Sequence, residues 1–213
     1  MTLLAKGQVA GLTEKSAQAA GSQKFYCGAA WDGDVDLDLI AVPVAGNGTV
    51  DTHDVCYFQR LECFDGAIKH SGDALSGDAS DGKGGVDDGD DESLVLKLDE
   101  LAAGVAAVVI GIVAYNVQDM SAAKNTKFVI RDGDTAVAPE LYTMPMADDD
   151  VEGETVLVAC TLQRGPSGWN VTSKSVFRTD FGNQMAAVHG LVQIASQYVS
   201  LGQAPAEGQT ATG

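Results

Sequence analysis

Acidic residues are concentrated in two short segments of this 213-residue chain. Asp32–Asp38 holds four of them, one at every second position, and Asp73–Glu92 holds eight, so 12 of the 30 Asp and Glu residues lie there. In an extended chain the first four carboxylates would share one face. Neighbouring carboxylates repel one another, which raises their pKa values or favours the binding of a cation. Calcium is the cation that best suits a cluster of hard carboxylate oxygens. The pattern therefore predicts a calcium site, with a solvated acidic strand edge as the alternative for Asp32–Asp38 alone.

Common calcium-binding motifs do not fit these segments. An EF-hand loop needs glycine at its sixth position, where Asp32–Asp38 has Leu37 and the segment beginning at Asp81 has Val86. The chain also lacks the nonapeptide repeat of haemolysin-type arrays. The second segment is rich in glycine, with Gly77, Gly82, Gly84, Gly85 and Gly89, which predicts a long loop. A calcium site here would belong to another architecture.

The rest of the chain has the pattern of an all-β protein. Short stretches rich in Val, Ile, Tyr, Phe and Thr alternate with Gly, Asn and Asp. The predicted strands are Phe25–Trp31, Val35–Val44, Val55–Arg60, Ala67–His70, Ser93–Leu98, Val105–Val117, Lys127–Arg131, Ala136–Tyr142, Glu154–Gln163 and Gly168–Phe177. About ten strands with frequent turns indicate a β-sandwich. Arg164–Gly168 and Asp132–Asp134 are the expected hairpin connections.

Helix is expected mainly near the C-terminus. Met185, Val188, Val192 and Val199 form an apolar stripe at helical spacing, with Asp180 as a cap, and His189 is expected to pack among these residues. A short helical turn is expected at Asp99–Ala103, ending at Gly104. From residue 202 onward no large apolar residue occurs, which predicts a flexible tail.

Five ordered pieces of the sequence form a recognisable series. They are Trp31-Asp32, Asp36-Leu37-Asp38, Asp65–Asp73 with its Asp-Gly and His-Ser-Gly-Asp ends, Ser76-Gly77, and Gly89-Asp90-Asp91-Glu92. Together they resemble the TerD domain of tellurium-resistance and general stress proteins. The resemblance runs from about Phe25 to Tyr198. Three features depart from the family pattern: residues 78–88 look like an insertion, Ala74 stands where the family has Asn after Gly-Asp, and the strand that commonly ends in His-Asp ends in Tyr115-Asn116.

The resemblance implies a calcium-binding β-sandwich and assigns its metal ligands. The implied ligands are Asp36, Asp38, Asp73, Asp90, Asp91 and Glu92, with Asp78 and Asn116 as further candidates. Together with the composition of the last residues, it predicts an N-terminal segment that joins the domain (1–24), the TerD-like domain (25–201) and the flexible tail (202–213). His70 is expected near the acidic loop, where it orients that loop.

Charge and composition exclude several classes of partner. A net charge of −17 disfavours direct binding to nucleic acid or to an anionic membrane.

The N-terminus lacks the pattern of a secretory signal, and the longest apolar run is too short to span a bilayer as a helix, so a cytoplasmic location is expected. Cys27, Cys56 and Cys160 lie in apolar runs, where free thiols behave as small hydrophobic groups.

No constellation of residues predicts an enzyme. Only His53, His70 and His189 are available as general bases, and no phosphate-binding loop occurs. Three functions remain open. The first is a calcium-binding stress or resistance protein that binds protein partners, and the second is a calcium-stapled structural subunit of a virus particle or other assembly. The third is a calcium-dependent membrane binder similar to C2 domains, which the loop disfavours because it lacks hydrophobic or basic tip residues.

Overall fold

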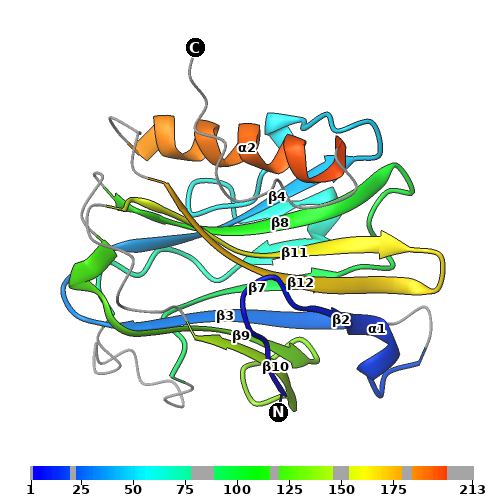
Figure 1. Ribbon diagram of the computed structural model, residues 1–213, viewed down its shortest axis with the longest axis horizontal. Helices are drawn as coiled ribbons and strands as arrows, with labels where there is room; N and C mark the ends of the chain where they lie inside the picture. Colours follow the sequence, from blue (N-terminus) through cyan, green and yellow to red (C-terminus); the bar gives the residue numbers. More distant parts are fainter. Residues whose placement is uncertain are drawn as a thin grey trace.

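The computed structural model describes residues 2–19, 23–77, 89–115, 120–145, 154–178 and 184–200 of the chain as two packed β-sheets and a C-terminal helix (Figure 1). The seven-stranded sheet has the order β1 (Thr2–Leu3), β10 (Glu140–Pro145), β9 (Lys124–Asp132), β3 (Lys24–Asp32), β7 (Glu92–Lys97), β6 (Ile68–His70) and β5 (Glu62–Cys63). The five-stranded sheet has the order β2 (Val9–Gly11), β12 (Gly168–Arg178), β11 (Val156–Gly165), β8 (Val105–Ala114) and β4 (Leu37–Ala45). Neighbouring strands are antiparallel, except that β1 is parallel to β10. The predicted all-β sandwich is confirmed.

Side-chain alternation decides which face of each sheet forms the core. On β7, Leu94 and Leu96 are fully buried between the sheets, whereas Val95 and Lys97 lie on the partly exposed face. β8 is instead apolar on both faces because both are covered, one by the opposing sheet and the other by helix α2 (Gln184–Ser200). Its long hydrophobic run is therefore a central strand.

Helix α2 lies across the outer face of the five-stranded sheet (Figure 1). Val188, Leu191 and Ala195 are buried there against side chains of β4, β8 and β11. Gly111 on β8 permits the close approach, because a Cβ at that position would lie 2.5 Å from Leu191 Cδ2. The predicted helix is thus present, but the expectation that His189 packs is wrong. His189 is exposed because it points away from the buried stripe.

Several predicted boundaries are also wrong. Residues 55–60 form two isolated bridges, Ala41 with Cys56 and Tyr57 with Arg60, and no continuous strand. Residues 99–103 are turns and not helix, since Glu100 N–H donates to Lys97 O and Val105 N–H donates to Ala102 O. β10 begins at Glu140, because residues 133–139 form the connection from β9. The turn at 165–168 joins β11 to β12 as expected.

The N-terminal segment belongs to the sandwich. β1 and β2 each extend a sheet, and α1 (Leu12–Lys15) packs beside β12. Short 3-10 turns occur at η1 (Thr52–Asp54), η2 (Phe64–Gly66) and η4 (Met120–Ala122). In the part of the chain that the structure describes, no helix is long and apolar enough to cross a membrane. Residues 78–88, Asp180 and the tail lie outside the described residues.

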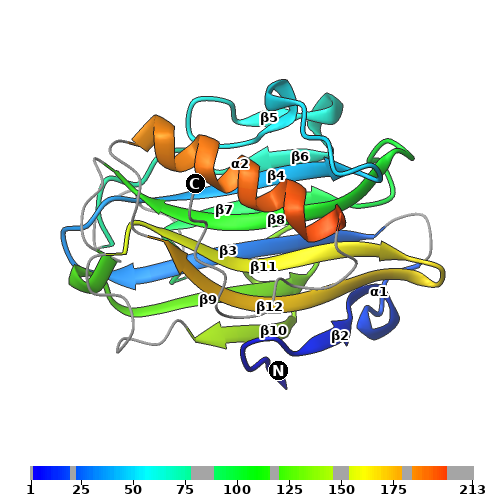
Figure 2. The same ribbon diagram turned by 45° about the horizontal axis from the view of Figure 1, so that its top comes forward.

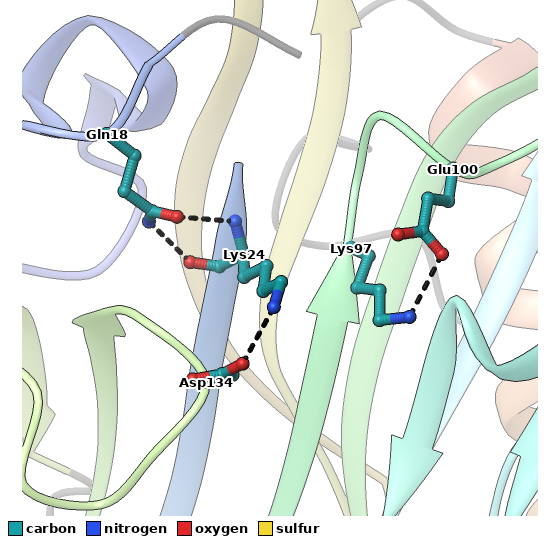
Figure 3. Close-up of polar contacts among 5 residues, drawn as sticks. All are labelled: Gln18, Lys24, Lys97, Glu100 and Asp134. Carbon is teal, nitrogen blue, oxygen red and sulfur yellow. Dashed lines mark hydrogen bonds and ion pairs between the residues drawn. The ribbon is translucent and has the colours of Figure 1, made fainter. Parts of the chain in front are cut away.

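One end of the sandwich, where β3 begins and β7 ends, is held by lysine contacts (Figure 3). Gln18 and the backbone of Lys24 exchange two hydrogen bonds, Nε2 to Lys24 O at 2.6 Å and Lys24 N to Oε1 at 2.9 Å. Lys24 Nζ lies 2.9 Å from Asp134 Oδ2, and Lys97 Nζ lies 3.0 Å from Glu100 Oε2. Each of the two carboxylates in this group, Asp134 and Glu100, therefore forms an ion pair with a lysine.

Candidate metal centre

The acidic segments meet at the other end of the sandwich. β3 ends there at Asp32, β4 begins at Leu37, β6 ends at His70 and β7 begins at Glu92. Because β3 and β7 are antiparallel, with Ala29 opposite Glu92, the chain segments that follow β3 and precede β7 converge. Segments far apart in the sequence thus place their carboxylates together.

Asp36, Asp38 and Asp73 form the acidic cluster. One carboxylate oxygen from each lies within 4.8 Å of those of the other two. Asp36 and Asp38 are buried, with exposed fractions of 9% and 1%, whereas Asp73 is exposed. Leu37 and Leu39 alternate with these aspartates and enter the hydrophobic core, so packing of β4 fixes the two carboxylates.

The surroundings of the cluster raise the pKa of one of its carboxylates. Burial, together with the negative charges of Asp73 and Glu92, raises the pKa of Asp36 to about 6. Desolvation and like charge both disfavour the ionised carboxylate. A bound cation would favour the ionised form and so oppose both effects.

Glu92 is fully enclosed and ties the segments around the cluster together. Its Oε2 accepts the Leu39 N–H of β4 at 2.7 Å, and its Oε1 accepts the Ala74 N–H at 3.1 Å. Glu92 is 1% exposed, so these bonds to a carboxylate form away from water, where they are strong. The loop carrying Asp73 is thereby held against the strand carrying Asp38.

His70 completes this arrangement. Its Nδ1 accepts the Gly72 N–H at 3.0 Å, which assigns the proton to Nε2, and Nε2 donates to Leu39 O at 2.8 Å. Nε2 also lies 3.4 Å from Glu92 Oε2. Burial lowers the pKa of His70, but the hydrogen bond and charge of Glu92 outweigh it, so the net shift is upward. His70 does lie beside the acidic loop and contacts its backbone.

Asp90 and Asp91 make other contacts. Asp90 forms a buried ion pair with Arg131 of β9, and Asp91 Oδ2 accepts the Trp31 N–H at 2.9 Å. Gly28 must remain glycine, because a Cβ there would lie 2.5 Å from the Asp90 carboxylate carbon. Trp31 in turn donates from Nε1 to Val35 O at 2.7 Å, which shapes the Asp32–Asp38 segment. Asp90 therefore contacts a side chain of β9, and Asp91 holds the backbone of β3.

Comparison with known proteins assigns the family. The TerD domain matches residues 1–180, which is most of the chain. The chain belongs to the TerD domain family. The match includes the residues before Phe25, in agreement with the strands that the N-terminal segment contributes.

Several curated relatives of this TerD-domain chain are named for tellurium resistance or stress response. The chain is 26% identical to the tellurium resistance protein TerD of Alcaligenes sp over 208 residues, which cover 92% of this chain and 95% of the relative. It is 25% identical to the stress response protein SCP2 of Bacillus subtilis over 187 residues, covering 78% and 87% of the two chains. A solved structure of a TerD homologue from Streptomyces coelicolor superposes with a TM-score of 0.58 at 21% identity. The superposition covers 86% of this chain and 99% of that one. That structure supports the fold.

The eight predicted ligands of the TerD-domain chain fall into three groups. Asp36, Asp38 and Asp73 gather in the cluster, while Asp90, Asp91 and Glu92 have the protein contacts described above. Asp78 and Asn116 lie outside the described residues. Sequence reasoning missed Arg131, which reaches Asp90 from β9. No local signal could identify it, because strand pairing alone brings β9 to β3.

Proposed function

We propose that this TerD-domain chain is a non-catalytic calcium-binding protein with the cluster of Asp36, Asp38 and Asp73 as its centre. The observation that carries the proposal is the convergence of three carboxylates, two of them buried, within 4.8 Å. Concentrating like charge in this way is unfavourable unless a cation neutralises it.

The donor set fits calcium. All three side chains offer hard oxygen atoms, and the cluster contains no histidine or cysteine, which disfavours zinc. Three carboxylates supply at most six oxygens, because each can bind through one or both of its own. The loop on which Asp73 lies tolerates irregular geometry, which suits calcium better than the octahedral coordination that magnesium requires. Asp36 and Asp38 would hold the ion from the β4 side and Asp73 from the loop side.

A role in tellurite resistance or stress response is proposed from the relatives. Proteins with these names match most of their own length to this chain. In this proposal, calcium orders the loop around Asp73 and thereby forms a surface for protein partners.

The absence of catalysis is part of the proposal. His70 is buried with both ring nitrogens engaged by backbone groups, so it is a poor general base. His53 is exposed and contacts only Asp51 among its described hydrogen-bond partners. These arrangements favour structural roles for both side chains.

Calorimetric titration of the purified protein with calcium, and separately with magnesium, tests the proposal. We expect tighter binding of calcium and a loss of at least tenfold in affinity for Asp38→Asn. Asp134→Asn is the matched control, since it removes the same charge at the opposite end of the sandwich and should leave calcium affinity unchanged. Equal affinity for the two ions, or equal effects of the two substitutions, would contradict the proposed site.

A further inference from the structure

A pair of cysteines lies at the open edge of the sandwich. Cys56 bonds to Ala41 of β4, the edge strand of the five-stranded sheet, through N···O contacts of 2.9 and 3.0 Å in both directions. Cys63 lies on β5, the edge strand of the seven-stranded sheet, opposite Ile68. In Figure 2, β4, β5 and β6 all lie toward the top of the view. The segment 56–63 therefore crosses from one sheet to the other.

This crossing brings the two thiols together. The backbones of Tyr57 and Arg60 exchange two hydrogen bonds, N to O at 3.0 and 2.8 Å, and turn the chain sharply. His70 N–H then donates to Leu61 O at 2.8 Å, which continues the β5–β6 ladder and fixes the return. Both cysteines are buried in the same hydrophobic cluster and their side chains are hydrogen-bonded. Both are reduced.

The edge pair differs from the other two cysteines. Cys27 on β3 and Cys160 on β11 also interact, but both are 0% exposed in the centre of the core, and burial raises the pKa of each. Cys56 is also 0% exposed, but its neighbour Cys63 retains 8% exposure beside the exposed Glu62. Their hydrogen bond lowers the pKa of Cys56, with help from the charges of His70 and Arg60 and against the effect of burial, and it raises the pKa of Cys63. The pair therefore combines a thiol that ionises more easily, Cys56, with a neighbour that reaches the edge of the sandwich, Cys63.

We propose that Cys56 and Cys63 form a redox-active dithiol that a peroxide converts to an intramolecular disulfide joining the two sheets. One thiolate attacks a peroxide oxygen, the O–O bond breaks, and the leaving hydroxide is protonated to water, which produces a sulfenic acid. The second thiolate attacks that sulfur, the S–S bond forms, the S–O bond breaks, and hydroxide again leaves as water. Two thiols thus lose two electrons and two protons, and one peroxide becomes two waters. This inference does not depend on calcium binding.

Peptide mapping of the full-length protein after hydrogen peroxide treatment tests the proposal. We expect the intact mass to fall by two hydrogen atoms. Trypsin cleaves after Arg60, between the two cysteines, so the product is a pair of peptides that separates on reduction. Because the peptide that ends at Arg60 also contains Cys27, fragmentation must locate the bond on Cys56. The oxidised protein should melt several degrees higher, since the bond constrains the unfolded chain.

Matched variants complete the test. Cys63→Ser should abolish the mass loss, whereas Cys27→Ser should leave it intact because Cys27 lies in the closed core. The mapping of the unmodified sequence decides the question even if a variant fails to fold. The proposal is wrong if Cys56 and Cys63 stay free to react with alkylating reagent after peroxide treatment. It is also wrong if the mapped bond joins Cys27 to Cys160, or if the edge bond forms only after denaturation.

Discussion

The two ends of this sandwich use carboxylates in opposite ways. At the end shown in Figure 3, Asp134 pairs with Lys24, and Asp132 accepts hydrogen bonds from Ser16, Ala17 and Gln18. The Lys24 bond lowers the pKa of Asp134, and at Asp132 the hydrogen bonds outweigh the opposing effect of burial, so that pKa is lowered as well. At the other end, burial and neighbouring carboxylates raise the pKa of Asp36 to about 6.

The contrast shows that environment, and not residue type, decides whether the pKa of a carboxylate is raised or lowered. The lysine end stabilises its charges with groups of the protein itself. The acidic end instead brings the carboxylates of Asp36, Asp38 and Asp73 together, an arrangement that a bound cation would stabilise. Perturbing each end in turn should therefore give effects of different size and of different dependence on calcium.

The largest effect should come from Glu92→Ala. This change would leave the buried Leu39 N–H and the partly buried Ala74 N–H without their charged acceptor and would open a cavity beside His70. We expect a loss of about 4 kcal/mol in the free energy of unfolding, measured by urea denaturation in chelator. Glu100→Ala, at the exposed lysine end, is the control and should cost less than about 1 kcal/mol. Similar losses for the two variants would mean that Glu92 does not tie the segments together.

Removal of calcium should have the next largest effect. A ligand that binds only the native state adds about 2.7 kcal/mol at a hundred times its dissociation constant, so chelator should lower the melting temperature by roughly 5–10 °C. Asp38→Asn should remove most of this difference, because Asp38 is 1% exposed inside the cluster. Melting curves that coincide with and without chelator at low salt would show that the cluster binds no calcium.

A smaller effect should appear in the pH dependence of the calcium-free protein. The pKa of Asp36 is about 6 in the folded state and 3.8 as the reference value for the unfolded chain. Its contribution to stability is therefore fully present below pH 3.8 and is lost as pH rises through 6. Asp36→Asn should remain more stable than the unmodified protein at pH 7, and this advantage should disappear near pH 4. Thermal melts across this range measure it, and a constant difference would contradict the assigned shift.

The smallest effect should come from Asp134→Asn. The pair with Lys24 is surface-exposed, so its loss should cost less than about 1 kcal/mol. The cost should shrink further with added salt and should be equal with and without calcium. A calcium-dependent cost, measured by thermal melts, would mean that the two ends are coupled.

Sequence patterns are sufficient to predict the strands and helices in which buried and exposed positions alternate regularly. The alternation at Leu94–Leu98 and the apolar stripe of residues 188–195 each indicate their element, because the core dictates which positions must be apolar. Residues 55–60 and 99–103 were predicted wrongly, because local propensity does not reveal where a sheet ends or a turn replaces a helix. The strands before residue 20 are short and gain their partners only from β10 and β12.

The sequence by itself determined that Asp36 and Asp38 share a face, because strand geometry fixes a period of two residues. It also determined, through the order of five motifs, the family to which the chain belongs. Only the tertiary structure decided that Asp73 joins Asp36 and Asp38, whereas Asp90 pairs with Arg131 and Glu92 holds backbone N–H groups. Neighbouring acids in one motif are chemically alike, and what separates them is the partner that strand pairing brings from distant parts of the chain.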